Sequence, residues 1–168
     1  MSRFAVPGEP AVAPLLVIGV GNLLMGDEGV GIHALRELEA GPALPGADLL
    51  DGGTGGLNLL EAIERAPIVI MLDATRDGQP AGTITWLRPA RVADLPHGLS
   101  AHDFGLKDLF AASALLGKFP EIHLVTISVE TIRPMCLVLS HEVAQAVPEV
   151  VRQVRALVAE LAPTAVAH

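Results

Sequence analysis

Short, unbroken apolar runs recur along the chain and alternate with segments that have helical spacing. LLVIGV (15–20) and PIVIMLDA (67–74) are the clearest of these runs. Strands that are buried on both faces show this pattern, because helices cover both sides of a parallel sheet. Further strands are predicted over 47–53, 83–88 and 121–130, and helices over 29–40, 54–66, 105–119 and 141–161. We therefore expect an α/β sandwich with a mostly parallel, five-stranded sheet.

One strand is expected to run against the others. Only the turn-rich segment RDGQPAG (76–82) separates the strand over 67–74 from the strand over 83–88. A parallel crossover needs about a dozen residues or more, usually with a helix. The strand over 83–88 should therefore be antiparallel, which makes the sheet mixed.

Composition excludes several classes of protein. The 168 residues are 51% hydrophobic and carry a net charge of −8, which suits one globular domain and neither a nucleic-acid binder nor a protein of anionic membrane surfaces. A single cysteine excludes an internal disulfide framework. The oily segment 11–25 is shorter than the roughly 20 residues that span a bilayer. We expect a cytoplasmic monomer with a flexible leader (1–14), one domain (15–161) and a frayed tail (162–168).

Acidic side chains follow two of the predicted strands. Asp27 and Glu28 come after the first strand, Asp73 closes the third, and His102 lies in the long loop over 91–105. Ligands of open α/β sheets bind beyond the carboxyl ends of the strands. Two carboxylates and an imidazole suit a divalent cation, although acids at a helix start also compensate the helix dipole. Both interpretations stay open on these residues alone.

Other polar residues at the same edge are candidates for substrate contact. Asn22 follows the first strand and Asp51 ends the second. The pair Gly19 and Gly21 also suggests a nucleotide-binding α/β domain, but the fingerprint needs a third glycine where Leu24 stands. Carboxylates at the following helix start would repel a pyrophosphate. A nucleotide site is therefore the weaker alternative.

Four blocks of the sequence resemble the hydrogenase maturation proteases. The stretch VIGVGNLLMGDEGVGIHAL (17–35) resembles the family signature G-x-G-N-x-L-x-x-D-(D/E)-G-x-G. The later blocks are DGGTGGLNLL (51–60), VIMLDA (69–74) and SAHDFGLKDLFAASALLGKFPE (100–121). The blocks occur in the family's order and spacing, and the resemblance covers about residues 15–160.

The resemblance implies a fold and a metal-binding set. The fold is a three-layer α/β/α sandwich on a twisted five-stranded sheet of order 2-1-3-5-4, with the fourth strand antiparallel. The metal-binding residues of the family correspond to Glu28, Asp73 and His102. Many members have Asp where this chain has Glu28, which adds one methylene of reach.

The resemblance also implies an activity. The family's reaction is a single endoproteolytic cut near the C-terminus of the large-subunit precursor of a nickel–iron hydrogenase, after nickel insertion. The nickel is carried by the substrate, and no organic cofactor is involved. Members are often classed as aspartic-type peptidases, and Asp27 or Asp73 is the expected general base. A non-catalytic chaperone that binds nickel or the precursor on the same scaffold is the alternative.

Overall fold

The computed structural model describes residues 13, 15–54, 59–99 and 106–165. Within these ranges the chain forms one five-stranded sheet in the order β2-β1-β3-β5-β4. The strands are β1 (Leu15–Gly19), β2 (Ala47–Asp51), β3 (Ile68–Thr75), β4 (Ile84–Leu87) and β5 (Glu121–Ser128). All neighbouring pairs are parallel except β4 and β5, which are antiparallel. The mixed sheet and its expected order are both confirmed.

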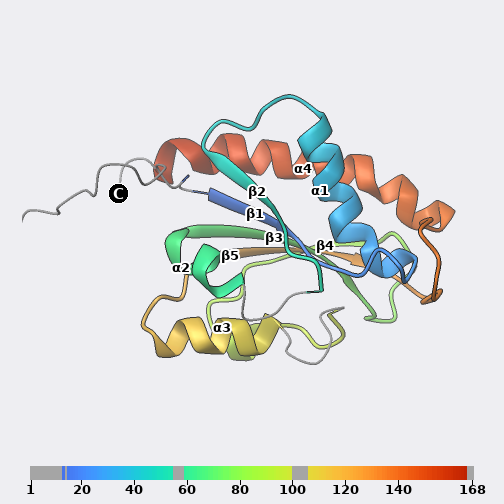
Figure 1. The fold of residues 1–168 in the computed structure, drawn as a ribbon, viewed down its shortest axis with the longest axis horizontal. Helices are drawn as coiled ribbons and strands as arrows, with labels where there is room; N and C mark the ends of the chain where they lie inside the picture. Colours follow the sequence, from blue (N-terminus) through green and yellow to red (C-terminus); the bar gives the residue numbers. More distant parts are fainter. Residues whose placement is uncertain (1–12, 14, 55–58, 100–105, 166–168) are drawn as a thin grey trace, which may run out of the picture.

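Helices cover both faces of the sheet. Figure 1 shows α1 and α4 on one face and α2 and α3 on the other, so the molecule has the expected three layers. The helices are η1 (Asp27–Gly29, a 3-10 turn), α1 (Val30–Ala40), α2 (Leu60–Arg65), η3 (Val92–Asp94, a 3-10 turn), α3 (Leu106–Leu115) and α4 (His141–Ala165). None of the described helices is long and apolar enough to cross a membrane.

Three helices differ from the expectation by more than one residue. α3 ends at Leu115, earlier than the expected end at 119. α4 continues beyond Leu161 to Ala165. α2 begins at Leu60, later than the expected range 54–66, and residues 55–58 lie outside the described ranges. Most of the expected leader and the last three residues of the expected tail also lie outside them.

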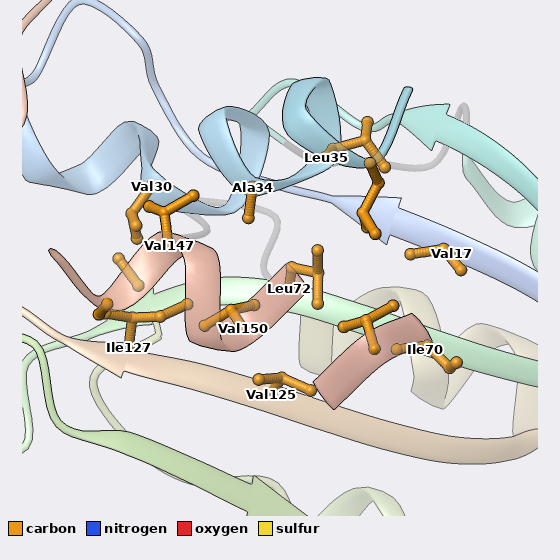
Figure 2. Packing of buried hydrophobic residues seen from close by; sticks show 14 of the residues in the cluster. Val17, Val30, Ala34, Leu35, Ile70, Leu72, Val125, Ile127, Val147 and Val150 are labelled. Atoms are coloured by element: carbon orange, nitrogen blue, oxygen red, sulfur yellow. The ribbon is translucent and has the colours of Figure 1, made fainter. Parts of the chain in front are cut away.

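Alternating strand residues build two apolar cores, one on each face. Successive strand side chains point to opposite faces of a sheet. Val17, Ile70 and Leu72 therefore pack against α1 and α4 (Figure 2), whereas Ile18 and Met71 pack against α2 and α3. Burial of each such side chain contributes about 1.5–3 kcal/mol. The unbroken apolar pattern of the central strands follows from having a core on both sides.

The two edge regions of the sheet are less buried than its centre. All eight residues of β3 are buried, whereas the four residues of β4 are half-buried. The Trp86 indole N–H of β4 donates a hydrogen bond to the Gln153 side chain of α4. This bond joins the antiparallel edge strand to the last helix.

Candidate active site at the carboxyl edge of the sheet

The candidate site lies at the carboxyl ends of β1 and β3, the point at which the order of the strands in the sheet reverses. These strands are neighbours, yet β2 lies on the far side of β1 and β5 on the far side of β3. Ligands of doubly wound sheets bind at such a switch point. The chain leaves β1 with the Val20 N–H donating to the Leu72 carbonyl of β3 at 3.0 Å, and η1 then packs against β3. Glu28 on η1 and Asp73 on β3 therefore lie at the same carboxyl edge of the sheet.

Glycines of the first block allow η1 to approach the strand ends. A Cβ on Gly21, which has φ 147°, would lie 2.1 Å from the Glu28 carbonyl oxygen. A Cβ on Gly31 would lie 2.3 Å from the Leu72 carbonyl oxygen. Both distances are far below van der Waals contact, so any larger residue would push the turn away. Because these glycines have no side chain, the backbone around Glu28 can pack closely against the strand ends.

Asp27 is buried and connects η1 to the last helix. The Ser140 backbone N–H donates to Asp27 Oδ1 at 2.6 Å, and Asp27 is 3% exposed. Ser140 directly precedes α4, and its carbonyl accepts the Ala144 N–H at 2.8 Å. The carboxylate thus has a structural function at the start of α4. Its expected function as a general base stays a prediction.

Glu28 is a buried carboxylate on the wall of an open pocket, and Asp73 is a buried carboxylate next to Ala74, another residue of that wall. Glu28 is 2% exposed and Asp73 is fully buried, with Asp73 Oδ1 accepting the Ala74 N–H at 2.8 Å. Glu28 and Ala74 both line a pocket of about 670 Å³. Carboxylate oxygens are ligands that a divalent cation accepts, so a cation that enters the pocket would meet Glu28 on its wall. Coordination of a cation by Asp73 stays a prediction.

The third expected ligand, His102, lies outside the described residues. Leu99, three residues earlier, forms a β-bridge with Thr75 at the end of β3, and the Arg76 N–H donates to the Gly98 carbonyl at 3.0 Å. Within the described ranges, no three His, Cys, Asp or Glu side chains are grouped to hold a metal ion. Metal binding by the set of three stays a prediction.

The two residues expected to contact substrate shape the loops in which they stand. Asn22 Oδ1 accepts the Leu24 N–H at 3.0 Å, and Asp51 Oδ1 accepts the Gly53 N–H at 2.9 Å. Each is a side-chain-to-backbone turn of the kind that Asn and Asp favour. These bonds hold the loops after β1 and β2 in place, and substrate contact by either residue stays a prediction.

Several pocket residues carry no signal in the sequence. Arg76 and Glu130 bring charges of both signs to the pocket, and Gly98, Val129 and Ile132 complete part of its wall. Arg76 could have drawn attention because it directly follows β3, the strand that carries Asp73. The others come from loops far along the chain, so only the fold assembles them.

The chain is similar to a family of known proteins. A model of the family described as "Hydrogenase maturation protease" matches residues 32–157, which include Asp73 and His102 and begin after Glu28. The chain belongs to the hydrogenase maturation protease family. The family's expected fold and the observed sheet order agree.

Individual proteins are also similar to this chain in sequence and structure. A hydrogenase expression/formation protein HupD of Thiocapsa roseopersicina is 34% identical over 121 residues, covering 70% of this chain and 54% of the relative. The structure of the hydrogenase maturating endopeptidase HybD from Escherichia coli is 33% identical, with a TM-score of 0.79, and the match covers 87% of this chain and 92% of that one. A NiFe hydrogenase maturation protease HybD from Thermococcus kodakarensis is 27% identical, with a TM-score of 0.70 and coverage of 86% and 98%.

The chain is short relative to some of its curated relatives. It spans 54%, 60% and 55% of the length of three proteins named HupD. What those proteins do as a whole therefore enters only as a proposal for this chain.

Proposed function

We propose that this protein is an endopeptidase that removes a C-terminal extension from the large-subunit precursor of a nickel–iron hydrogenase after nickel insertion. Membership of the hydrogenase maturation protease family supports hydrolysis of a hydrogenase precursor. The observation that carries the proposal is the buried Glu28 carboxylate on the wall of a pocket at the switch point, with the buried Asp73 next to Ala74 in the same wall.

Nickel is part of the substrate in this proposal. Carboxylate oxygens from Glu28 and Asp73, together with the His102 imidazole, are donors that a borderline divalent cation accepts. Three protein ligands leave positions open for groups of the precursor that already hold the ion. A precursor without nickel lacks this link and is not cut.

The proposed chemistry is addition of water to one peptide carbonyl. A carboxylate of the site, Asp27 or Asp73, accepts a proton from water as the oxygen attacks the carbonyl carbon. A cation near the carbonyl oxygen stabilises the negative charge that develops there. When the C–N bond breaks, the proton passes to the leaving amine, and a new carboxyl and a new amino terminus result. Assignment to the aspartic-type class stays a prediction, as do cytoplasmic location and a monomeric state.

The direct test is the mass of a purified large-subunit precursor before and after incubation with the protein, with and without bound nickel. We expect the nickel-loaded precursor to lose a short C-terminal peptide and the nickel-free precursor to keep its mass. Binding of the nickel-loaded precursor without any change in mass would contradict the proposal and favour the chaperone alternative.

Replacement of one carboxylate tests the site itself. Glu28→Gln keeps the size of the side chain and removes its charge, which weakens its bond to the nickel, so we expect loss of at least about 10-fold in trimming rate, the lower end for changes around a metal site. Glu39→Gln, an exposed position on α1, is the matched control and should trim normally. Trimming by Glu28→Gln at the wild-type rate would exclude Glu28 from the site.

A further inference from the structure

Four large apolar side chains are exposed together on two loops beside the pocket. Leu24 is 51% exposed, Met135 85%, Leu137 61% and Val138 69%. Leu24 lies in the loop after β1, and the other three lie in the loop between β5 and α4. We call these four residues the apolar rim. Only two other large hydrophobic residues of the described ranges are comparably exposed, Leu115 and Leu116.

Backbone hydrogen bonds hold the two loops of the rim together. The Cys136 N–H donates to the Leu24 carbonyl at 3.0 Å, and the Gly26 N–H donates to the Cys136 carbonyl at 2.8 Å. The Arg133 guanidinium also donates to the Val138 carbonyl at 3.1 Å. Because the two bonds of Cys136 join segments more than 100 residues apart, the rim is a defined surface of the fold.

The backbone of the rim is held in an unusual conformation. Met135 has φ 57°, and it is the one non-glycine residue with positive φ within the described ranges. This region is unfavourable for a side chain with a Cβ and marks sites where the surroundings impose the conformation. The fold therefore accepts backbone strain to hold a loop that presents apolar side chains to water.

The rim continues directly into the pocket. Gly26, two residues before Glu28, forms a β-bridge with Ile132, and both Glu28 and Ile132 line the pocket. The segments 22–26 and 131–139 contain no acidic residue, although the chain carries a net charge of −8. An apolar strip in which Arg133 is the one charged residue thus leads from the protein surface to the pocket that Glu28 lines.

We propose that the apolar rim binds an apolar stretch of the hydrogenase precursor close to the peptide bond that is cut. This inference rests on the proposed function and names the surface by which the substrate is held. Clustered exposed apolar residues mark interaction sites, and continuity with the pocket identifies the polypeptide substrate as the occupant. Burial of the rim positions the precursor so that its nickel and its scissile bond enter the pocket together.

The test is a triple variant, Met135→Ser, Leu137→Ser and Val138→Ser, assayed with nickel-loaded precursor. We expect KM to rise by at least about tenfold while kcat stays within about twofold, because uniform binding is lost and the chemistry is not touched. The matched control is Leu115→Ser with Leu116→Ser, a comparably exposed pair at the C-terminal end of α3, at the opposite edge of the sheet. The control should keep the wild-type KM, and both variants should keep the wild-type melting temperature.

A crosslinking measurement does not depend on turnover. A photoreactive amino acid placed at position 137 should crosslink to the C-terminal region of the precursor, and the same amino acid at position 115 should not. This measurement also tests contact between the rim and the precursor if the triple variant does not fold.

The outcomes separate the two proposals. If the wild-type protein cuts the precursor and the rim variant does so with unchanged KM, the rim inference is wrong and the proposed function stands. If the wild-type protein leaves every nickel-loaded precursor intact, the proposed function fails and the inference falls with it. Dimerisation of the wild-type protein that the triple variant abolishes would show a second copy on the rim and overturn the inference.

Discussion

Two adjacent acids, Asp27 and Glu28, have different surroundings in the folded protein. Asp27 Oδ1 accepts the Ser140 N–H from a residue 113 positions away, whereas Glu28 lines the pocket. Both also stand in the first turn of η1, where acidic residues favour the helix start. Asp27 thus has a structural contact at the start of α4, whereas metal binding by Glu28 stays a prediction.

Replacement of Asp27 can separate a structural function from a catalytic one. Asp27→Ala leaves the Ser140 N–H without its acceptor, so we expect the free energy of unfolding to fall by about 1–3 kcal/mol in urea denaturation. Asp27→Asn keeps an acceptor oxygen and should lose less stability. If Asp27 is the general base, Asp27→Asn folds but does not trim the precursor.

The control for this pair is Asp48→Ala, an exposed position on β2, where we expect a change within about 0.5 kcal/mol. Wild-type stability of Asp27→Ala would show that the bond to Ser140 contributes nothing. Wild-type trimming by Asp27→Asn would leave Asp73 as the expected base.

At the scale of elements, the site depends on how closely η1 and α1 approach the ends of β1 and β3. Gly31 at the start of α1 lies against the Leu72 and Val20 carbonyls, where a Cβ would come within 2.3 and 2.5 Å. The signature glycines are therefore required by helix-to-strand packing. Phosphate binding, which the Gly19 and Gly21 pair suggested, is not needed to explain them.

Gly31→Ala should disturb both stability and the site. We expect the free energy of unfolding to fall by about 2–3 kcal/mol, because backbone oxygens must move to admit the methyl group. Gly53→Ala is the matched control: Gly53 has φ 53° and open space around its Cβ, so only the backbone penalty of about 1 kcal/mol applies. Chemical denaturation of both variants measures the difference, and equal losses would contradict the packing argument.

At the scale of the whole molecule, two apolar cores share the same central strands. Ile70 and Val125 face one core, while Met71 and Leu124, their neighbours in sequence, face the other. Trp86, the single tryptophan of the chain, packs on the α1 and α4 side. A loss of packing on either face should therefore destabilise the protein as one unit.

Leu109→Ala on α3 tests this coupling from the opposite face. Leu109 is 1% exposed, so we expect a loss of about 2–5 kcal/mol from the cavity that the variant creates. The unfolding midpoints seen by Trp86 fluorescence and by far-UV circular dichroism should fall together, as in a two-state transition. A Trp86 transition that stays at the wild-type midpoint would show that the two layers unfold independently.

Local pattern and tertiary structure determined different parts of this protein. Apolar periodicity indicates which segments are strands and helices, and the short connection over 76–82 makes β4 antiparallel, because both depend on residues close in sequence. Periodicity does not determine strand order, which came from the resemblance of four blocks to a known family.

The acids at the strand ends were also visible in the sequence, because an acid that ends an apolar strand stands out locally. Only the tertiary structure decided that Asp27 binds the start of α4 and that Arg76 and Ile132 line one pocket. Only it placed Leu24 beside Met135 to form the rim. Such contacts join segments that are far apart in the sequence, in some cases by more than 100 residues. They arise from the packing of whole layers, and this packing leaves no periodic signal in either segment.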